Sequence, residues 1–310
     1  MIKCMFLFFV PLVVFSQTSS SEEFSLKTPT GTILGTLTTP ADAGTDTPLV
    51  LLIAGSGPTD RNGNGPGFRS DAYQKLAEAL SQRGVAMLRY DKRGVAGSKS
   101  AAVREEDLTF DTFIQDAVGW VDTLRKTRRF GKITVAGHSE GSLIGMVAAR
   151  RAHADRYVSI AGAGRNINEV LKTQLATLPD SMRMEAYRGL DSLREGKRVQ
   201  KPNPLLYSIF RPSVQPFVIS WMQYDPAEEI IKLDMPVAIV QGGHDIQVAM
   251  SEAERLREAR PSAKWIVFDA MNHLLKDAPA ERNANLATYN QPDFPLTIGL
   301  VEAIADFIKE

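Results

Sequence analysis

The sequence predicts an α/β protein with a mostly parallel central sheet, helices on both faces and an inserted helical cap. Short apolar runs typical of strands alternate with longer amphipathic segments typical of helices, which indicates parallel strands joined by right-handed crossovers. The run at 49–54 is apolar at every position, as in a strand buried on both faces. The alternation stops between residues 165 and 232, where six prolines interrupt helical pieces and no strand-like run occurs.

The predicted elements follow in chain order. Residues 23–30 and 32–39 alternate in side-chain character around a Thr-Gly pair, which predicts an antiparallel hairpin. Strands of the parallel sheet are expected at 49–54, 85–90, 132–136, 156–161, 235–240 and 264–268. Helices are expected at 70–83, 109–128, 143–151, 249–259 and 294–310.

Residues 1–17 are predicted to be a signal peptide, which makes the protein secreted or periplasmic. Lys3 precedes an apolar run over 5–15 that is too short to span a bilayer, and cleavage is expected near Gln17, where the chain turns small and polar. The alternative is an uncleaved membrane anchor. Cys4 is the single cysteine and would leave with the signal, so the mature chain would hold no disulfide and no cysteine metal site.

The remaining chain is divided into a core and a cap. The core is expected to comprise residues 18–164 and 233–310, and the cap residues 165–232. Between Arg165 and Pro212 the cap carries nine basic and five acidic side chains, which are either solvated helix faces or part of a site for an anionic substrate.

The charge balance argues against a nucleic-acid partner. The chain has 36 basic and 36 acidic residues, and no charge run resembles a nucleic-acid surface. After the first 17 residues no apolar stretch is long enough to cross a membrane, and the sequence shows no cluster of His and carboxylate metal ligands. A small-molecule substrate is therefore expected, without a cofactor, a metal or a membrane anchor in the mature protein.

The candidate nucleophile is Ser139. It lies in the run Gly137-His138-Ser139-Glu140-Gly141, between a β-branched strand-like segment and a helix-forming one. This strand, sharp turn and helix order is that of a nucleophile elbow, where the two glycines are needed because side chains would clash. The pattern occurs by chance, so it gains weight only if a base and an acid follow in the chain.

A serine hydroxyl needs a base with a near-neutral pKa, which makes histidine the usual partner. The four histidines are His138, His153, His244 and His273. His273 follows the last predicted strand, at the sheet edge where active sites gather, and is the predicted base. The side chain of His138, next to the serine, is expected to point elsewhere.

The base needs a carboxylate that orients its ring. Asp245 follows the strand at 235–240 and completes the chain order Ser, Asp, His, so it is the predicted acid. Asp269 and Asp277 flank the histidine within its own loop, where a neighbour is poorly placed to orient the ring. Asp225, near the end of the cap, is the other candidate.

The oxyanion that forms on attack needs two backbone N–H donors. One is expected from Glu140, at the start of the helix after the nucleophile, and the second from Ser56 in the Gly-rich loop 55–67. Gly57 is the alternative second donor. The loop is unlike a phosphate cradle, because it matches neither the Walker A pattern nor a strand-linked G-x-G-x-x-G.

With these residues the chain resembles the α/β-hydrolase superfamily, and within it the EstD-type bacterial serine esterases of the serine aminopeptidase and monoacylglycerol lipase branch. The motifs that carry the resemblance are Gly55-Ser56-Gly57-Pro58-Thr59-Asp60-Arg61, Tyr90-Asp91-Lys92-Arg93-Gly94, Gly137-His138-Ser139-Glu140-Gly141, Gly242-Gly243-His244-Asp245 and Met271-Asn272-His273.

The resemblance has two departures. Many relatives have His-Gly where this chain has Ala54-Gly55, so here the oxyanion hole must rest on backbone groups. Ala96 stands where Gly is usual, which alters a turn. Asp91 and Arg93 are interpreted as bracing the loops beneath the site, with direct substrate contact as the alternative.

The resemblance implies a serine carboxylesterase that hydrolyses short-chain acyl esters through an acyl-enzyme. Two alternatives stay open. One is a serine peptidase or amidase of the same fold, in which Glu169 or Glu185 of the cap would bind a substrate amine. The other is a catalytically silent binding protein that keeps the fold.

Overall fold

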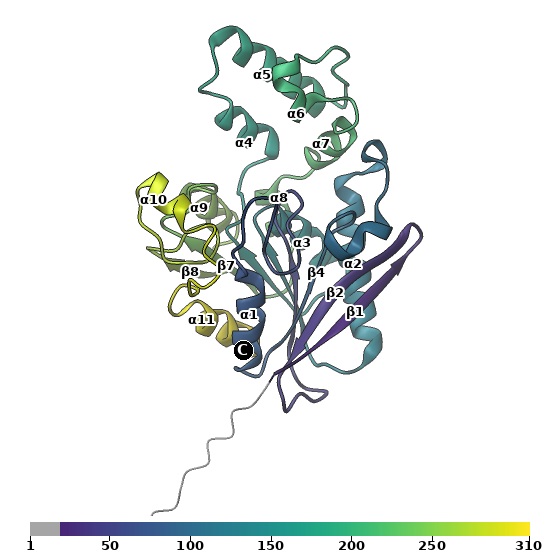
Figure 1. Ribbon diagram of the computed structural model, residues 1–310, viewed down its shortest axis with the longest axis vertical. Helices are drawn as coiled ribbons and strands as arrows, with labels where there is room; N and C mark the ends of the chain where they lie inside the picture. Colours follow the sequence, from purple (N-terminus) through teal and green to yellow (C-terminus); the bar gives the residue numbers. More distant parts are fainter. Residues whose placement is uncertain (1–18) are drawn as a thin grey trace, which may run out of the picture.

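The computed structural model describes residues 19–310, with one eight-stranded sheet at the centre (Figure 1). The predicted signal peptide at 1–17 lies outside the described residues. The strands are β1 (Ser20–Thr28), β2 (Gly31–Thr39), β3 (Leu49–Ile53), β4 (Ala86–Tyr90), β5 (Ile133–His138), β6 (Arg156–Ile160), β7 (Val237–Gly242) and β8 (Lys264–Phe268). Their order in the sheet is β1-β2-β4-β3-β5-β6-β7-β8.

The sheet is mostly parallel, as predicted. Strands β3 to β8 run parallel, whereas β2 is antiparallel to both β1 and β4. The chain leaves β3 toward β4 on one side and returns to β5 on the other, so the loops after β3 and β5 separate at their carboxyl ends. Such a switch in strand order leaves a crevice, the usual ligand site of open α/β sheets.

Helices cover both faces of the sheet, because the parallel strands are apolar on both sides. On β3, Leu51 joins the cluster under α2 (Phe110–Thr127), α3 (Glu140–Arg151), α8 (Pro226–Ile231) and α9 (Met250–Ala259). Its neighbour Leu52 joins the cluster on the opposite face, under α1 (Ala72–Ser81) and α11 (Leu300–Lys309). The two faces therefore bury separate apolar cores around one layer of strands.

A group of cap helices lies between β6 and β7 and appears in Figure 1 as a layer above the sheet. It contains α4 (Ile167–Gln174), α5 (Asp180–Arg194), the 3₁₀ turn η3 (Pro204–Leu206), α6 (Tyr207–Phe210) and α7 (Gln215–Trp221). These helices have their own apolar cluster, built around Leu190 and Phe210. The side-chain amide of Asn166 donates to the carbonyls of Met222 and Tyr224, at 2.9 and 3.0 Å, and so ties the two connections of the cap together.

Some elements differ from the sequence prediction. Helix α8 lies within the segment predicted as cap, yet its Ile230 is buried in the core cluster with α3 and α9. The last helix begins at Leu300 rather than at 294, because Pro295 disfavours helical backbone at the residue before it and Gly299 adopts φ +84°. Helix α10 (Arg282–Ala287) was not predicted.

Shorter 3₁₀ turns, η1 (Ala96–Ala101) and η2 (Glu105–Asp107), connect β4 to α2. No helix within residues 19–310 is both long and apolar enough to cross a bilayer.

Candidate active site

Ser139 lies on a strained turn between β5 and α3. Its backbone has φ 56° and ψ −122°, outside the regions that a non-glycine residue adopts without cost. A Cβ at Gly137 would lie 2.1 Å from the carbonyl oxygen of Gly141, and one at Gly141 would lie 2.3 Å from that of Ile53. Both glycines are thus required by close backbone approach, and the turn has the geometry predicted for a nucleophile elbow.

His273 and Asp245 form a buried pair. Asp245 follows β7 and His273 follows β8, and the Nδ1 of the histidine lies 2.7 Å from Oδ2 of the carboxylate. The other carboxylate oxygen accepts the N–H groups of Gln247 and Val248, at 2.8 and 2.9 Å. Burial alone would raise the pKa of Asp245, but the hydrogen bond and charge of His273 and the two backbone donors outweigh it and lower the pKa.

The competing carboxylates are placed differently. Asp225 caps α8 by accepting the N–H of Ala227 at 2.9 Å. Among the described residues, Asp269 and Asp277 form no ion pair with His273. Among the ion pairs of residues 19–310, the one that includes a histidine joins His273 to Asp245. The other downstream histidine, His244, is bound through Nδ1 to the carbonyl of Ala278 at 2.6 Å.

Ser139 and His273 line the same cavity, of about 490 Å³, at the carboxyl ends of the central strands. The side chains of α4 and Trp221 form its wall on the cap side. Within the described residues 19–310, Nε2 of His273 forms no hydrogen bond. This nitrogen is therefore available to the hydroxyl of Ser139. Catalytic hydrogen bonds of this kind are often long in the free enzyme and shorten when substrate binds.

The loop after β3 lies against the nucleophile. A Cβ at Gly55 would lie 3.0 Å from the Cβ of Ser139, which is tighter than most such contacts, so glycine favours this close approach. In the part of the chain that the structure describes, the backbone N–H groups of Ser56 and Glu140 donate no hydrogen bond. The two residues line the cavity together with Ser139, and their role as oxyanion donors stays a prediction.

Comparison with known proteins assigns the chain to a family. Residues 64–277 match the model of the family described as serine aminopeptidase, S33. The chain belongs to this family. Esterase EstD of Thermotoga maritima is 31% identical over 258 residues, which cover 80% of this chain and 60% of that protein. The chain thus spans about 60% of the length of this relative.

Solved structures show the same fold. Est1E from Butyrivibrio proteoclasticus is 18% identical, with a TM-score of 0.59 over 93% of this chain and 99% of that one. The esterase Pf2001 of Pyrococcus furiosus is 17% identical, with a TM-score of 0.57 over 96% and 95%. The predictions of an α/β-hydrolase fold and of a resemblance to Esterase EstD are confirmed.

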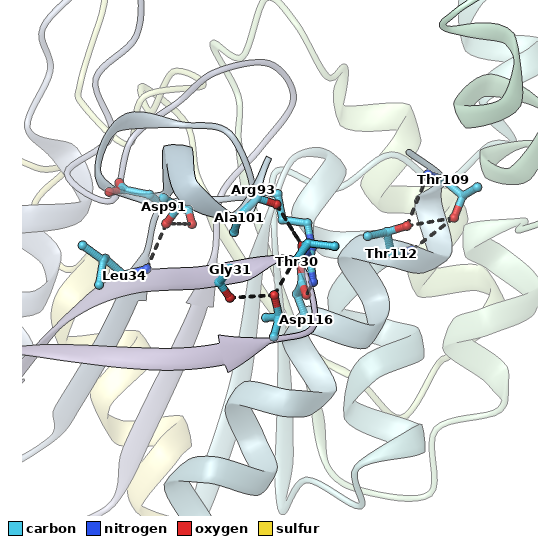
Figure 2. A network of polar contacts seen from close by, with 11 residues as sticks. Thr30, Gly31, Leu34, Asp91, Arg93, Ala101, Thr109, Thr112 and Asp116 are labelled. Carbon is cyan, nitrogen blue, oxygen red and sulfur yellow. Dashed lines mark hydrogen bonds and ion pairs between the residues drawn. The ribbon is translucent and has the colours of Figure 1, made fainter. Parts of the chain in front are cut away.

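In this member of the serine aminopeptidase family, Asp91 and Arg93 hold loops together, as interpreted from the sequence (Figure 2). Asp91 accepts hydrogen bonds from the backbone and guanidinium of Arg61 and from the N–H of Gly97. The guanidinium of Arg93 forms a two-pronged pair with the buried Asp116 of α2, with both contacts at 2.6 Å. Neither residue lines the cavity.

The side chain of His138 was expected to point away from the site, but it lines the cavity. Its ring lies beside that of His273, with centroids 4.6 Å apart and ring planes 50° apart. Nε2 lies 2.9 Å from the backbone carbonyl of His273 and Nδ1 lies 2.8 Å from the hydroxyl of Tyr73. A carbonyl only accepts, so Nε2 carries the proton and Tyr73 donates to Nδ1. His138 therefore supports the loop of the predicted base.

This arrangement keeps His138 neutral. Burial, and then the neighbouring His273, lower the pKa of His138 to about 3. Between that value and the ordinary pKa of about 6.5, the unfolded chain binds a proton at His138 and the folded chain does not, so folding stability falls as pH falls. From pH 7 to pH 5 this histidine is expected to remove about 2 kcal/mol from the free energy of unfolding.

A His138→Gln variant is expected to lose that part of the pH dependence. Urea unfolding at pH 7 and pH 5 measures it, and His153→Asn, at an exposed position, controls for the loss of an imidazole. If the free energy of unfolding changes between pH 7 and pH 5 by the same amount in His138→Gln as in wild type, the ring of His138 takes up a proton in the folded protein.

Sequence reasoning also missed Lys92. Its side chain is 3% exposed and pairs with the carboxylate of Glu140, which is 5% exposed. The only signal in the sequence is its position just after the strand predicted at 85–90, between the charged residues Asp91 and Arg93. That signal does not show which of the three charges turns toward the site.

Proposed function

We propose that this chain is a serine carboxylesterase that acts on short-chain acyl esters through an acyl-enzyme. The observation that carries the proposal is one cavity into which the strained Ser139 and the paired His273 both open. The supporting comparison is the similarity to Esterase EstD. Export through the N-terminal segment stays a prediction.

The proposed steps follow from the geometry. Ser139 Oγ attacks the ester carbonyl while Nε2 of His273 takes its proton, because Nδ1 is already committed to Asp245. The N–H groups of Glu140 and Ser56 hold the oxyanion. His273 then returns the proton to the leaving alcohol, and a water molecule, deprotonated by the same nitrogen, releases the acid from Ser139.

The cavity favours a neutral ester over a substrate with a free amine. The only carboxylate among its lining residues within 19–310 is that of Glu140, which is paired with Lys92. Neither Glu169 nor Glu185 lines the cavity, and Glu185 accepts a hydrogen bond from Asn203 within the cap at 3.0 Å. A substrate ammonium group would therefore lack the charged partner that its desolvation requires.

The cap side of the cavity favours a short apolar group. Ile167, Val170 and Leu171 of α4 line it with Trp221, and Leu143 of α3 also lines the cavity. A volume of about 490 Å³ is in the lower half of the range of small-molecule sites, about 300–1,000 Å³. Within residues 19–310, Arg165 is the one Lys or Arg that lines the cavity, and its pairing with Glu252 neutralises a charge that would otherwise favour an anionic acyl group.

A substrate panel tests the proposal. The protein is expected to hydrolyse p-nitrophenyl acetate and butyrate faster than the octanoate, and to turn over aminoacyl p-nitroanilides at least about 100-fold more slowly, because the amine would lose about 3 kcal/mol or more on desolvation without a partner. The comparison is made on kcat/KM at constant pH. Amide turnover that exceeds ester turnover would overturn the ester assignment in favour of the peptidase.

A further inference from the structure

A buried cation lies beneath the loop that follows β3. The ammonium group of Lys92 donates to the carbonyl of Gly55 at 2.5 Å and lies 3.3 Å from Oε1 of Glu140. The ring of Phe113 covers it, with its centroid 5.2 Å away. A buried ion pair recovers little net stability after its desolvation, so folding alone is a weak reason for a lysine here.

The carbonyl that Lys92 holds belongs to the peptide that supplies a proposed oxyanion donor. The C=O of Gly55 and the N–H of Ser56 are two ends of one peptide unit, and no peptide bond within residues 19–310 is cis. In a trans peptide these two groups point in opposite directions. Because the carbonyl points to Lys92, the N–H of Ser56 points away from Lys92, and in the proposed mechanism it faces the cavity that Ser56 lines.

This peptide needs an anchor. Glycine allows backbone conformations that other residues do not, and this loop has Gly55 before the donor and Gly57, at φ +74°, after it. A flip of the Gly55–Ser56 peptide would turn a carbonyl oxygen toward the developing oxyanion in place of a donor. The hydrogen bond from a desolvated ammonium group opposes that flip.

Glu140 extends the same support to the second donor. One of its carboxylate oxygens pairs with Lys92, and the other accepts the hydroxyl hydrogen of Ser56 at 2.9 Å. Its own backbone N–H is the other proposed donor. One cation and one carboxylate thus connect both residues whose N–H groups would face the oxyanion.

We propose that Lys92 is a positioning residue that orients the oxyanion hole by holding the Gly55–Ser56 peptide and the carboxylate of Glu140. This inference rests on the proposed function. Because the hole binds the oxyanion and not the ground-state carbonyl, loss of Lys92 acts on kcat and leaves KM nearly unchanged. Removal of a whole oxyanion donor costs about 10²- to 10³-fold in kcat, so misorientation of one is expected to cost about 10- to 100-fold.

The test compares two ketones in wild type and Lys92→Met. A trifluoromethyl ketone with a short alkyl chain accepts Ser139 Oγ at its carbonyl carbon. The carbonyl electrons pass to oxygen and the serine proton passes to His273, so the adduct carries an oxyanion. The matching methyl ketone binds without forming it. The variant is expected to lose about 10- to 100-fold in kcat and in trifluoromethyl ketone affinity, with KM and methyl ketone affinity within about twofold of wild type.

Two further variants separate positioning from folding. Lys92→Met leaves the carboxylate of Glu140 buried without a cation, so the double variant Lys92→Met/Glu140→Gln, without either charge, is tested alongside it. It is expected to show the same loss of trifluoromethyl ketone affinity. Asp116→Asn breaks the buried pair with Arg93, outside the cavity, and controls for the loss of a buried charge. It is expected to lower the melting temperature and to leave trifluoromethyl ketone affinity within about twofold.

The outcomes are distinct. The inference would be overturned if a folded Lys92→Met variant kept trifluoromethyl ketone affinity within twofold of wild type. It would also be overturned if Asp116→Asn lost as much of this affinity as Lys92→Met. If wild type hydrolyses no ester and binds both ketones alike, the proposed function itself fails. Ester turnover by wild type, lost in Ser139→Ala but kept without Lys92, would reject the role of Lys92 alone.

Discussion

Replacement of Ser139 by alanine is expected to lower kcat for p-nitrophenyl butyrate by about 10⁶-fold, because no other group in the cavity would form the acyl-enzyme. The hydroxyl is the one nucleophile that the elbow presents beside the His273–Asp245 pair. A fluorophosphonate probe should label wild type and leave the variant unlabelled. Turnover and labelling are measured on the same preparations, with circular dichroism to verify the fold.

Ser142→Ala is the matched control for this change. Ser142 lies one turn along α3, and its hydroxyl is bound within the core to Tyr157 and Ser159 at 2.9 and 2.8 Å. This variant is expected to keep its labelling. Labelling of Ser139→Ala at the wild-type rate would exclude Ser139 as the nucleophile. If wild type is neither labelled nor active on esters, the result would support the alternative of a catalytically silent binding protein with this fold.

The core of the site could be predicted because its signals are local. The elbow is specified by a strand, two glycines that meet backbone atoms and a helix, all within one short segment. Asp245 and His273 follow from the rule that side chains after neighbouring parallel strands meet at one edge of the sheet. In the structure they lie 2.7 Å apart although 28 positions separate them in the chain.

Other features depend on contacts that no local pattern encodes. Lys92 meets Gly55 and Glu140 across 37 and 48 positions, and its two charged neighbours turn to other partners. The ring of His138 is held by the hydroxyl of Tyr73 and the backbone carbonyl of His273, which lie 65 and 135 positions away in the chain. Helix α8 was counted with the cap because proline breaks are visible in sequence, whereas the packing of Ile230 on the core is not.

Asp245→Asn is expected to lower kcat by about 10³- to 10⁴-fold while the fold is kept. Oδ1 of Asp245 already accepts the N–H groups of Gln247 and Val248, so the amide oxygen of asparagine would keep that place. Its NH₂ would then face Nδ1 of His273 and donate to it. The proton of the neutral ring would be forced onto Nε2, the nitrogen that must accept the proton of Ser139.

Asp277→Asn, in the loop of His273, is the control and should stay within about threefold of wild type, because its carboxylate is outside the buried pair. Acid titration adds a second readout. Because the pKa of Asp245 is lowered on folding, its stabilising contribution is complete above its ordinary pKa of about 3.9 and is lost as pH falls through the lower folded value. Asp245→Asn should lack that acid-dependent loss. If Asp277→Asn inactivates the protein while Asp245→Asn does not, the ring of His273 is oriented from within its own loop, and the assignment of Asp245 is wrong.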